Sequence, residues 1–137
     1  MKNTLLNTPA GLRDIYGTEY TKTLKLEKVV HTTMKLSAYH DPQTTTFEYF
    51  DVFSKEIGTT SSKDLYKFSD QEGNTLVLRP DFTPSVARCA AKYSREDQKT
   101  LRFCYQGNTF TNTLSFQGKL KEVTQTGVEL IGDGSVE

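Results

Sequence analysis

The sequence predicts an α+β domain in which helices flank an antiparallel sheet. Three observations indicate this class: a long amphipathic helix near the N-terminus, several short strand-like segments separated by turn residues, and a long hairpin of alternating residues near the C-terminus. The 137 residues suffice for one domain with a hydrophobic core, but hardly for two.

The amino-acid composition and the spacing of key residues limit the classes of function that the chain can have. The chain has 17 basic and 17 acidic residues, so its overall charge gives no reason to expect nucleic-acid binding. No apolar run approaches the roughly 20 residues that span a bilayer, and no signal-peptide core is present, so we expect a cytoplasmic protein without membrane contact. Cys89, Cys104, His31 and His40 lack the spacing of metal ligands, and no nucleotide-binding motif occurs. We therefore expect no metal site and no cofactor.

The first predicted element is a helix over residues Glu19–Ala38, with Thr18 as a candidate N-cap. Its apolar stripe at helical spacing consists of Leu26, Val29, Val30, Thr33 and Met34. The stripe fits either a helix that faces a partner or a helix that packs on a sheet, and the commonness of such stripes favours the sheet.

The next predicted elements are strands. Residues Thr44–Phe53 are rich in β-branched and aromatic side chains, which is typical of a strand at an interface or deep in the fold. Asp64–Ser69 and Asn74–Arg79 are two short strands around the sequence Asp-Gln-Glu-Gly, whose glycine predicts a hairpin turn.

A strand-to-helix junction follows this hairpin. Pro80 closes the strand, and Pro84 suits the first position of a helix over Ser85–Tyr93. Arg79, Asp81 and Thr83 stand at this junction, where free backbone N–H groups often bind ligands. The alternative is that Arg79 and Asp81 form a local salt bridge and that Thr83 only caps the helix, and spacing alone leaves both interpretations open.

The final hairpin joins Leu101–Phe110 to Lys121–Gly132. In the second strand one face carries Val123, Gln125, Gly127, Glu129 and Ile131, and the other carries Thr124, Thr126, Val128 and Leu130. We expect the second face to be half-buried core. Because glycine in a strand often marks a close approach, Gln125, Gly127 and Glu129 suggest the floor of a small polar site. Spacing alone favours the plainer alternative, a solvated sheet face with a bulge at Gly127.

The motifs GLRDIYG, FEYFDVF, RPDFT and Q-x-G-x-E-x-x-G occur in one order. In this order they resemble the catalytic core of histidyl-tRNA synthetase, a class II aminoacyl-tRNA synthetase. They resemble still more its paralogue family, the regulatory subunits of ATP phosphoribosyltransferase. The resemblance runs from about Thr8 to the end of the chain. It implies a six-stranded antiparallel sheet flanked by helices, of which residues 1–137 would form an N-terminal part containing motifs 1 and 2. We expect the chain to be a fragment of a longer protein.

The resemblance also implies a histidine pocket. In that family an acid and a threonine of the RPDFT motif, here Asp81 and Thr83, surround the ammonium group of histidine. Gln125 would assist at the ammonium, and Glu129 would accept a hydrogen bond from the imidazole. This agrees with the chemistry, because a buried ammonium and a ring N–H both need acceptors. Positive charge near the ATP side would come from Arg102, Lys119 and Lys121.

Two departures from the family pattern bear on activity. A synthetase has an arginine directly after the phenylalanine of the motif 2 hairpin, but here Thr111 follows Phe110. Threonine cannot replace a cation that holds the substrate carboxylate and the α-phosphate of ATP, so we expect the activation chemistry to be lost. In addition, Thr45 stands where motif 1 normally has a proline.

The resemblance therefore implies a non-catalytic regulatory subunit that senses histidine for feedback control. Its partner would be the short-form catalytic subunit of ATP phosphoribosyltransferase. A homodimer would form through the motif 1 helix and the strand at Phe47–Phe53, and tRNA binding is not expected. The alternatives are a fragment of a histidyl-tRNA synthetase, which activates histidine with ATP and transfers it to tRNA, and a binding module whose pocket has decayed.

Overall fold

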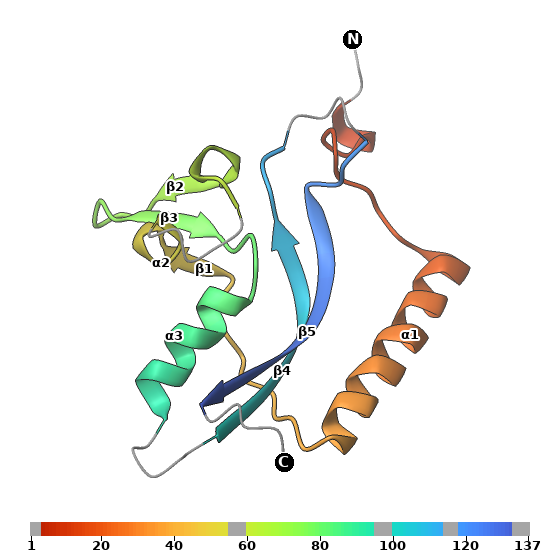
Figure 1. Ribbon diagram of the computed structural model, residues 1–137. Coiled ribbons are helices and arrows are strands. Elements are labelled where there is room, and N and C mark those ends of the chain that lie inside the picture. The colour runs from red at the N-terminus through yellow and green to blue at the C-terminus, as the bar shows by residue number, and fades with distance from the viewer. Residues whose placement is uncertain (1–3, 55–59, 95–99, 114–117, 133–137) are drawn as a thin grey trace.

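The computed structural model describes residues 4–54, 60–94, 100–113 and 118–132, and Figure 1 shows the order of their elements. The helices are η1 (Thr4–Leu6), α1 (Gly17–Leu36), α2 (Phe50–Ser54), η2 (Ser62–Asp64) and α3 (Thr83–Tyr93). The strands are β1 (Phe47–Tyr49), β2 (Lys67–Ser69), β3 (Thr75–Leu78), β4 (Thr100–Phe110) and β5 (Glu122–Gly132).

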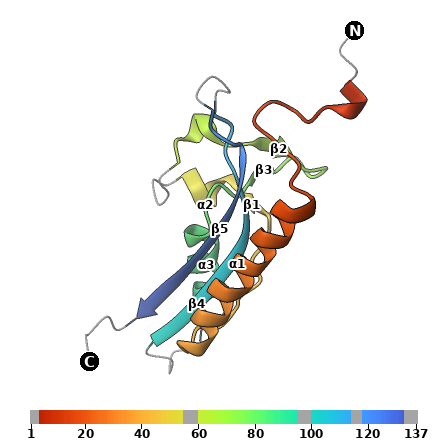
Figure 2. The same cartoon turned by 90° about the vertical axis from the view of Figure 1, so that its right-hand side faces the viewer.

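The β4–β5 hairpin is the centre of the fold. Helix α1 lies along one side of it and α3 along the other, in both views of the molecule (Figures 1 and 2). A second, three-stranded antiparallel sheet with the order β1-β3-β2 lies on the side of α3. The predicted α+β class, with helices flanking antiparallel sheets, is confirmed. Within the described ranges, no helix combines the length and hydropathy needed to cross a bilayer.

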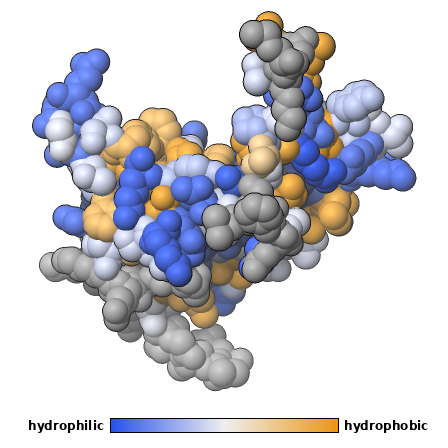
Figure 3. Space-filling view, turned by 90° about the horizontal axis from the view of Figure 1, so that it is seen from above, coloured by the Kyte–Doolittle hydropathy of each residue, from blue (hydrophilic) through white to orange (hydrophobic). Residues whose placement is uncertain are grey.

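Helix α1 is correctly predicted, but its apolar stripe does not pack on the sheet. The helix buries no residue, and Leu26 and Val29 are 65% and 64% exposed. A polar side chain faces the hairpin instead: the Glu27 carboxylate accepts a hydrogen bond from Gln106 of β4. Thr18 is also not the cap, because the helix already begins at Gly17. Seen from above, hydrophobic residues reach the surface in several patches among hydrophilic ones (Figure 3).

The strand predicted over residues 44–53 is only partly correct. Strand pairing covers Phe47–Tyr49, and the chain then turns into the short helix α2. One helical turn brings Phe50 and Phe53 to the same side, because residues three apart share a helix face. Both then pack with Leu65 and Val77 in a small core. Tertiary packing thus overrides the strand propensity of this aromatic run.

The predicted hairpin between residues 64 and 79 is confirmed with shorter strands, β2 and β3. Asp70 shapes its turn by accepting hydrogen bonds from the backbone N–H groups of Glu72 and Asn74. Gly73 completes the turn with a φ of +86°, which glycine adopts at little cost.

The β4–β5 hairpin pairs without interruption from Thr100 opposite Gly132 to Phe110 opposite Glu122. The predicted bulge at Gly127 is therefore absent, since Gly127 pairs directly with Tyr105. The expected burial of the two faces is also wrong. Val128 and Leu130 are 44% and 51% exposed, although they belong to the face expected to be core.

The face of β5 that carries Gln125 and Glu129 is the one that packs. It lies with Ile131 against the second core cluster, formed by Phe82, Val86 and Tyr105. A partly buried ion pair holds α3 to the neighbouring sheet, because two guanidinium nitrogens of Arg88 donate to the buried Glu48 carboxylate at 2.8 and 2.9 Å. The ion pair thereby joins α3 to β1 of the three-stranded sheet.

Candidate functional site

The structure brings Asp81, Thr83, Gln125 and Glu129 together. Asp81 and Thr83 stand where β3 leads into α3, and Gln125 and Glu129 project from one face of β5. The two segments are more than 40 residues apart in sequence, so only folding makes them neighbours. The convergence that the resemblance implied is therefore present in the geometry.

Two hydrogen bonds join the two segments. The Thr83 hydroxyl donates to Glu129 Oε1 at 2.6 Å, and Gln125 Nε2 donates to Asp81 Oδ1 at 3.1 Å. Asp81 Oδ1 also accepts from the backbone N–H of Thr83 at 3.4 Å. Each carboxylate keeps a second oxygen that can accept, and the Gln125 carbonyl oxygen and the Thr83 hydroxyl oxygen can accept as well.

The charge of this cluster is negative. Among the residues that the structure describes, no lysine, arginine or histidine forms a salt bridge with Asp81 or Glu129. Two carboxylates without a cationic partner, supported by hydroxyl and amide oxygens, suit a ligand that brings its own positive charge.

An aromatic pair forms the wall beside the cluster. The rings of Phe82 and Tyr105 stack at 4.6 Å between centroids with an interplanar angle of 10°. Burial is the main cause that raises the pKa of the Tyr105 hydroxyl, and the carboxylates of Glu129 and Asp81 add to it. Sequence reasoning did not identify either ring. The signal that could have found Tyr105 is Gly127, since a glycine in the middle of a strand leaves space for a large group opposite.

The interpretation of Arg79 and Asp81 as a local salt bridge is wrong. Arg79 is only 8% exposed, and its guanidinium donates to the backbone oxygens of Asn108 at 2.8 Å and Thr45 at 3.2 Å. It also lies over the Phe82 ring, 4.1 Å from the centroid. Arg79 therefore links three segments: the chain just before β1, strand β4 and the start of α3. Thr83 is not a helix cap either, because its hydroxyl is bonded to Glu129.

The three basic residues expected at the ATP side do not converge. Arg102 pairs with Leu130 near one end of the hairpin, whereas Lys121 directly precedes β5 at the other end. Lys121 and Leu130 are nine positions apart along the strand, which corresponds to about 31 Å at about 3.4 Å per residue. Lys121 packs against Gly11, Lys119 is exposed just before it, and the Arg102 guanidinium lies 5.6 Å from the centre of the Tyr39 ring.

The two residues that depart from the family pattern, Thr111 and Thr45, both form hydrogen bonds in the structure. Thr111 directly follows β4, and its backbone N–H donates to the carbonyl of Lys121 at 2.9 Å. Thr45 donates its hydroxyl to Glu48 at 3.0 Å, which helps to satisfy that buried carboxylate.

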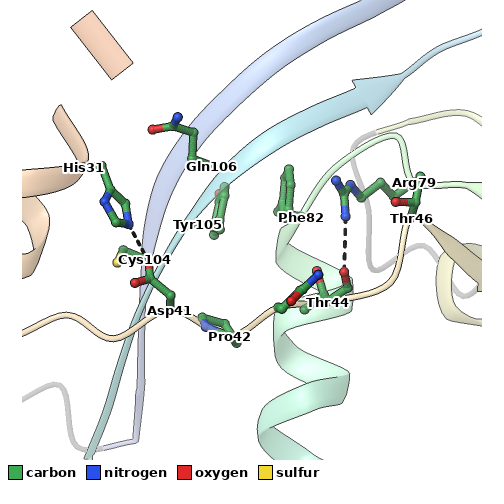
Figure 4. A pocket seen from close by; sticks show the side chains of 11 residues that line it. His31, Asp41, Pro42, Thr44, Thr46, Arg79, Phe82, Cys104, Tyr105 and Gln106 are labelled. Atoms are coloured by element: carbon green, nitrogen blue, oxygen red, sulfur yellow. Dashed lines mark hydrogen bonds and ion pairs between the residues drawn. The ribbon is translucent and has the colours of Figure 1, made fainter. Parts of the chain in front are cut away.

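A cavity of about 510 Å³ lies next to the four-residue cluster rather than within it. Phe82, Tyr105 and Arg79 contribute to its lining, but none of the four acceptors does (Figure 4). We place the candidate site at the acceptors because their charge and hydrogen bonding carry the chemistry. The other end of the cavity contains His31, Asp41 and Cys104, a group that sequence spacing missed because its members meet only in the fold.

Comparison with known proteins gives the family. The family model described as histidyl-tRNA synthetase matches residues 11–137. The ATP phosphoribosyltransferase regulatory subunit of Ruminiclostridium cellulolyticum is 42% identical over 95% of this chain and 31% of its own length. The protein of the same name from Acetivibrio thermocellus is 39% identical over the same shares. This chain thus spans about a third of the length of these curated relatives.

Solved structures agree with the sequence comparison. A crystal structure titled as an ATP phosphoribosyltransferase regulatory subunit/histidyl-tRNA synthetase, from Bacillus halodurans, superposes with a TM-score of 0.84 at 36% identity. The alignment covers 96% of this chain and 34% of that one. The resemblance inferred from the motifs is confirmed, and the chain belongs to the histidyl-tRNA synthetase family.

Proposed function

We propose that this chain is part of a non-catalytic regulatory subunit of ATP phosphoribosyltransferase, and that it senses histidine at the cluster of Asp81, Thr83, Gln125 and Glu129. The observation that carries the proposal is the convergence of four acceptor side chains, with no salt-bridge partner for either carboxylate in the described part of the chain. The names of the similar curated proteins support the regulatory role.

The chemistry of histidine matches the cluster. An ammonium group has three N–H donors, for which Asp81, the Thr83 hydroxyl and the Gln125 carbonyl offer acceptors. The imidazole ring N–H would donate to Glu129, whose carboxylate makes the bond charge-assisted. On binding, the hydrogen bonds from Thr83 to Glu129 and from Gln125 to Asp81 would be exchanged for hydrogen bonds to the ligand.

Loss of catalysis rests on Thr111. In the activation of an amino acid by ATP, a negative carboxylate attacks the negative α-phosphate and pyrophosphate leaves. A preorganised cation is needed to hold the two anionic groups together and to stabilise the charge that builds up on the α-phosphoryl oxygens. Thr111 offers a short neutral side chain instead. Feedback control would then arise if histidine binds one state of the assembly with the short-form catalytic subunit more tightly than another.

A homodimer through α1 and β1 is part of the proposal. The apolar side chains of α1 turn away from the hairpin, as the exposures of Leu26 and Val29 show. Phe47 and Tyr49 of β1 are 54% and 58% exposed. Covering such side chains in a symmetric interface would remove apolar area from water.

Titration calorimetry with L-histidine tests the proposal. Replacing Glu129 with Gln should weaken binding about tenfold or more, because a charge-assisted hydrogen bond worth about 1.5–3 kcal/mol becomes neutral. Glu122→Gln is the matched control, since Glu122 lies on the opposite face of the same strand. Equal affinities of Glu129→Gln and the unchanged protein would remove Glu129 from the site, and no heat at all would favour a decayed pocket.

The alternative function is a histidyl-tRNA synthetase fragment, which the description of the matching family model favours. Histidine-dependent exchange of pyrophosphate into ATP separates the two. The regulatory proposal expects no exchange above background, whereas robust exchange would establish activation chemistry despite Thr111.

A further inference from the structure

Three side chains of the types that can ligate metals meet at one end of the cavity. They come from three separate segments of the chain. His31 comes from α1, Asp41 from the segment after it, and Cys104 from β4 (Figure 4). The ligand atoms of the three residues all lie within 4.8 Å of one another. His31 Nε2 is 2.7 Å and Cys104 Sγ is 3.2 Å from the same oxygen, Asp41 Oδ1.

We infer that His31, Asp41 and Cys104 form a binding site for a divalent transition-metal cation of the zinc class. An imidazole nitrogen, a thiolate sulfur and a carboxylate oxygen are the donor types that Zn²⁺ accepts in proteins. This site is distinct from the four acceptors proposed for histidine, and it depends on none of them.

The present distances are close to those of a bound ion. In a tetrahedral zinc site the nitrogen and oxygen ligands stand about 3.4 Å apart, and the sulfur and oxygen ligands about 3.6 Å apart. The observed separations of 2.7 and 3.2 Å would have to widen by about 0.7 and about 0.4 Å. The separation of the His31 and Cys104 ligand atoms, which is within 4.8 Å, would have to close by up to about 1.2 Å. The Cys104 thiol now donates to Asp41, and on metal binding it would release its proton to solvent, because the thiolate is the ligand.

The surroundings suit a site with an open coordination position. Cys104 is fully buried, which fixes its side chain, and all three residues contribute to the lining of the 510 Å³ cavity. A three-ligand zinc site keeps its fourth position for water or a ligand, and here that position would face the cavity.

Lys35 donates a hydrogen bond to the cluster without being one of its three candidate ligands. Its ammonium is 2.8 Å from Asp41 Oδ2, the carboxylate oxygen that does not face the other two residues. It therefore orients the carboxylate so that Oδ1 points at His31 and Cys104, as outer hydrogen bonds do around metal ligands. Removing this hydrogen bond should therefore lower the metal affinity, because Asp41 would no longer be held in the orientation that presents Oδ1.

The rival explanation is a metal-free cluster that fastens α1 to β4 by hydrogen bonds. Competition of the protein with a chromophoric chelator for Zn²⁺ separates the two. We expect one zinc ion per chain, and a loss of affinity of tenfold or more in both Cys104→Ser and His31→Gln. Matched controls exist for each, because Cys89→Ser and His40→Gln make the same replacements outside the cluster and should leave the affinity unchanged.

Two measurements keep the test decisive if a ligand variant folds poorly. Co²⁺ added to the unchanged protein should give a thiolate-to-metal charge-transfer band, which Cys89→Ser retains. Lys35→Met, which leaves all three ligands in place but removes the hydrogen bond that orients Asp41, should weaken Zn²⁺ binding several-fold. The inference is overturned if the unchanged protein binds no Zn²⁺ at micromolar concentrations, or if Cys89→Ser and His40→Gln weaken binding as much as the cluster variants do.

Discussion

The ring of Tyr105 lies across Gly127 on the neighbouring strand. A Cβ atom at Gly127 would overlap with the Tyr105 hydroxyl and would stand 2.6 Å from ring atom Cζ. Gly127 therefore serves to admit a tyrosine, and that tyrosine in turn forms the wall beside Thr83 and Glu129. The glycine of the Q-x-G-x-E motif is a packing requirement of the candidate site.

Gly127→Ala tests this relationship. The added methyl group must displace the Tyr105 ring, so the free energy of unfolding should fall by about 1–3 kcal/mol in urea denaturation. In the double variant Gly127→Ala/Tyr105→Leu the smaller side chain leaves space, and the loss should be less than the sum of the two single losses. Additive losses would show that the two residues do not interact.

Arg79 should be irreplaceable by another cation. Arg79→Lys removes the planar donor group that bonds to Asn108 and Thr45 and stacks on Phe82, so we expect stability to fall by about 2–3 kcal/mol. The control is Arg102→Lys, the same substitution at an exposed arginine, which should cost under about 1 kcal/mol. Equal costs in urea denaturation would contradict the role given to Arg79.

Alkaline pH should destabilise the protein through Tyr105. Burial raises the pKa of this hydroxyl in the folded state, so above about pH 10 the unfolded chain releases the proton first and the free energy of unfolding falls. The stability difference between pH 8 and pH 10.5 should therefore be smaller in Tyr105→Phe than in the unchanged protein. Tyr93→Phe is the control, because Tyr93 is 69% exposed and should leave the pH dependence as it is.

The proposed dimer predicts an effect of charge on α1. Val29→Lys places an ammonium on the exposed apolar side of the helix, where a partner helix would bury it at a cost of several kcal/mol. Analytical ultracentrifugation should show a shift toward monomer. Tyr93→Lys, a similarly exposed hydrophobic residue on α3, should leave the mass unchanged, and a dimer that survives Val29→Lys would place the interface elsewhere.

Local patterns in the sequence were sufficient to locate most of the elements. Helical spacing identified α1, alternation identified β4 and β5, and the turn residues after Asp70 identified the β2–β3 hairpin. Their orientation was not predictable. The side of α1 that faces the hairpin carries Glu27 and His31. From the amphipathic pattern alone, one would expect the apolar side of the helix to face the hairpin instead.

Residue patterns suggested each half of the candidate site separately, but that the two halves meet was predictable only through the family resemblance. Asp81 and Glu129 are 48 positions apart, and no spacing rule relates a strand-to-helix junction to a distant strand. The alternatives left open by spacing, a salt bridge of Arg79 with Asp81 and a cap at Thr83, were local explanations. Each failed because the side chain found a partner far away in sequence, at Asn108 for Arg79 and at Glu129 for Thr83.

The most direct test of the proposed histidine site is the amide nitrogen–proton NMR spectrum of the protein during titration with L-histidine. The account predicts that the shifted resonances centre on Thr83, Gln125, Gly127 and Glu129, and that the same titration of Glu129→Gln needs more histidine for half-saturation. Shifts confined to residues far from these positions, or none at saturating histidine, would contradict it.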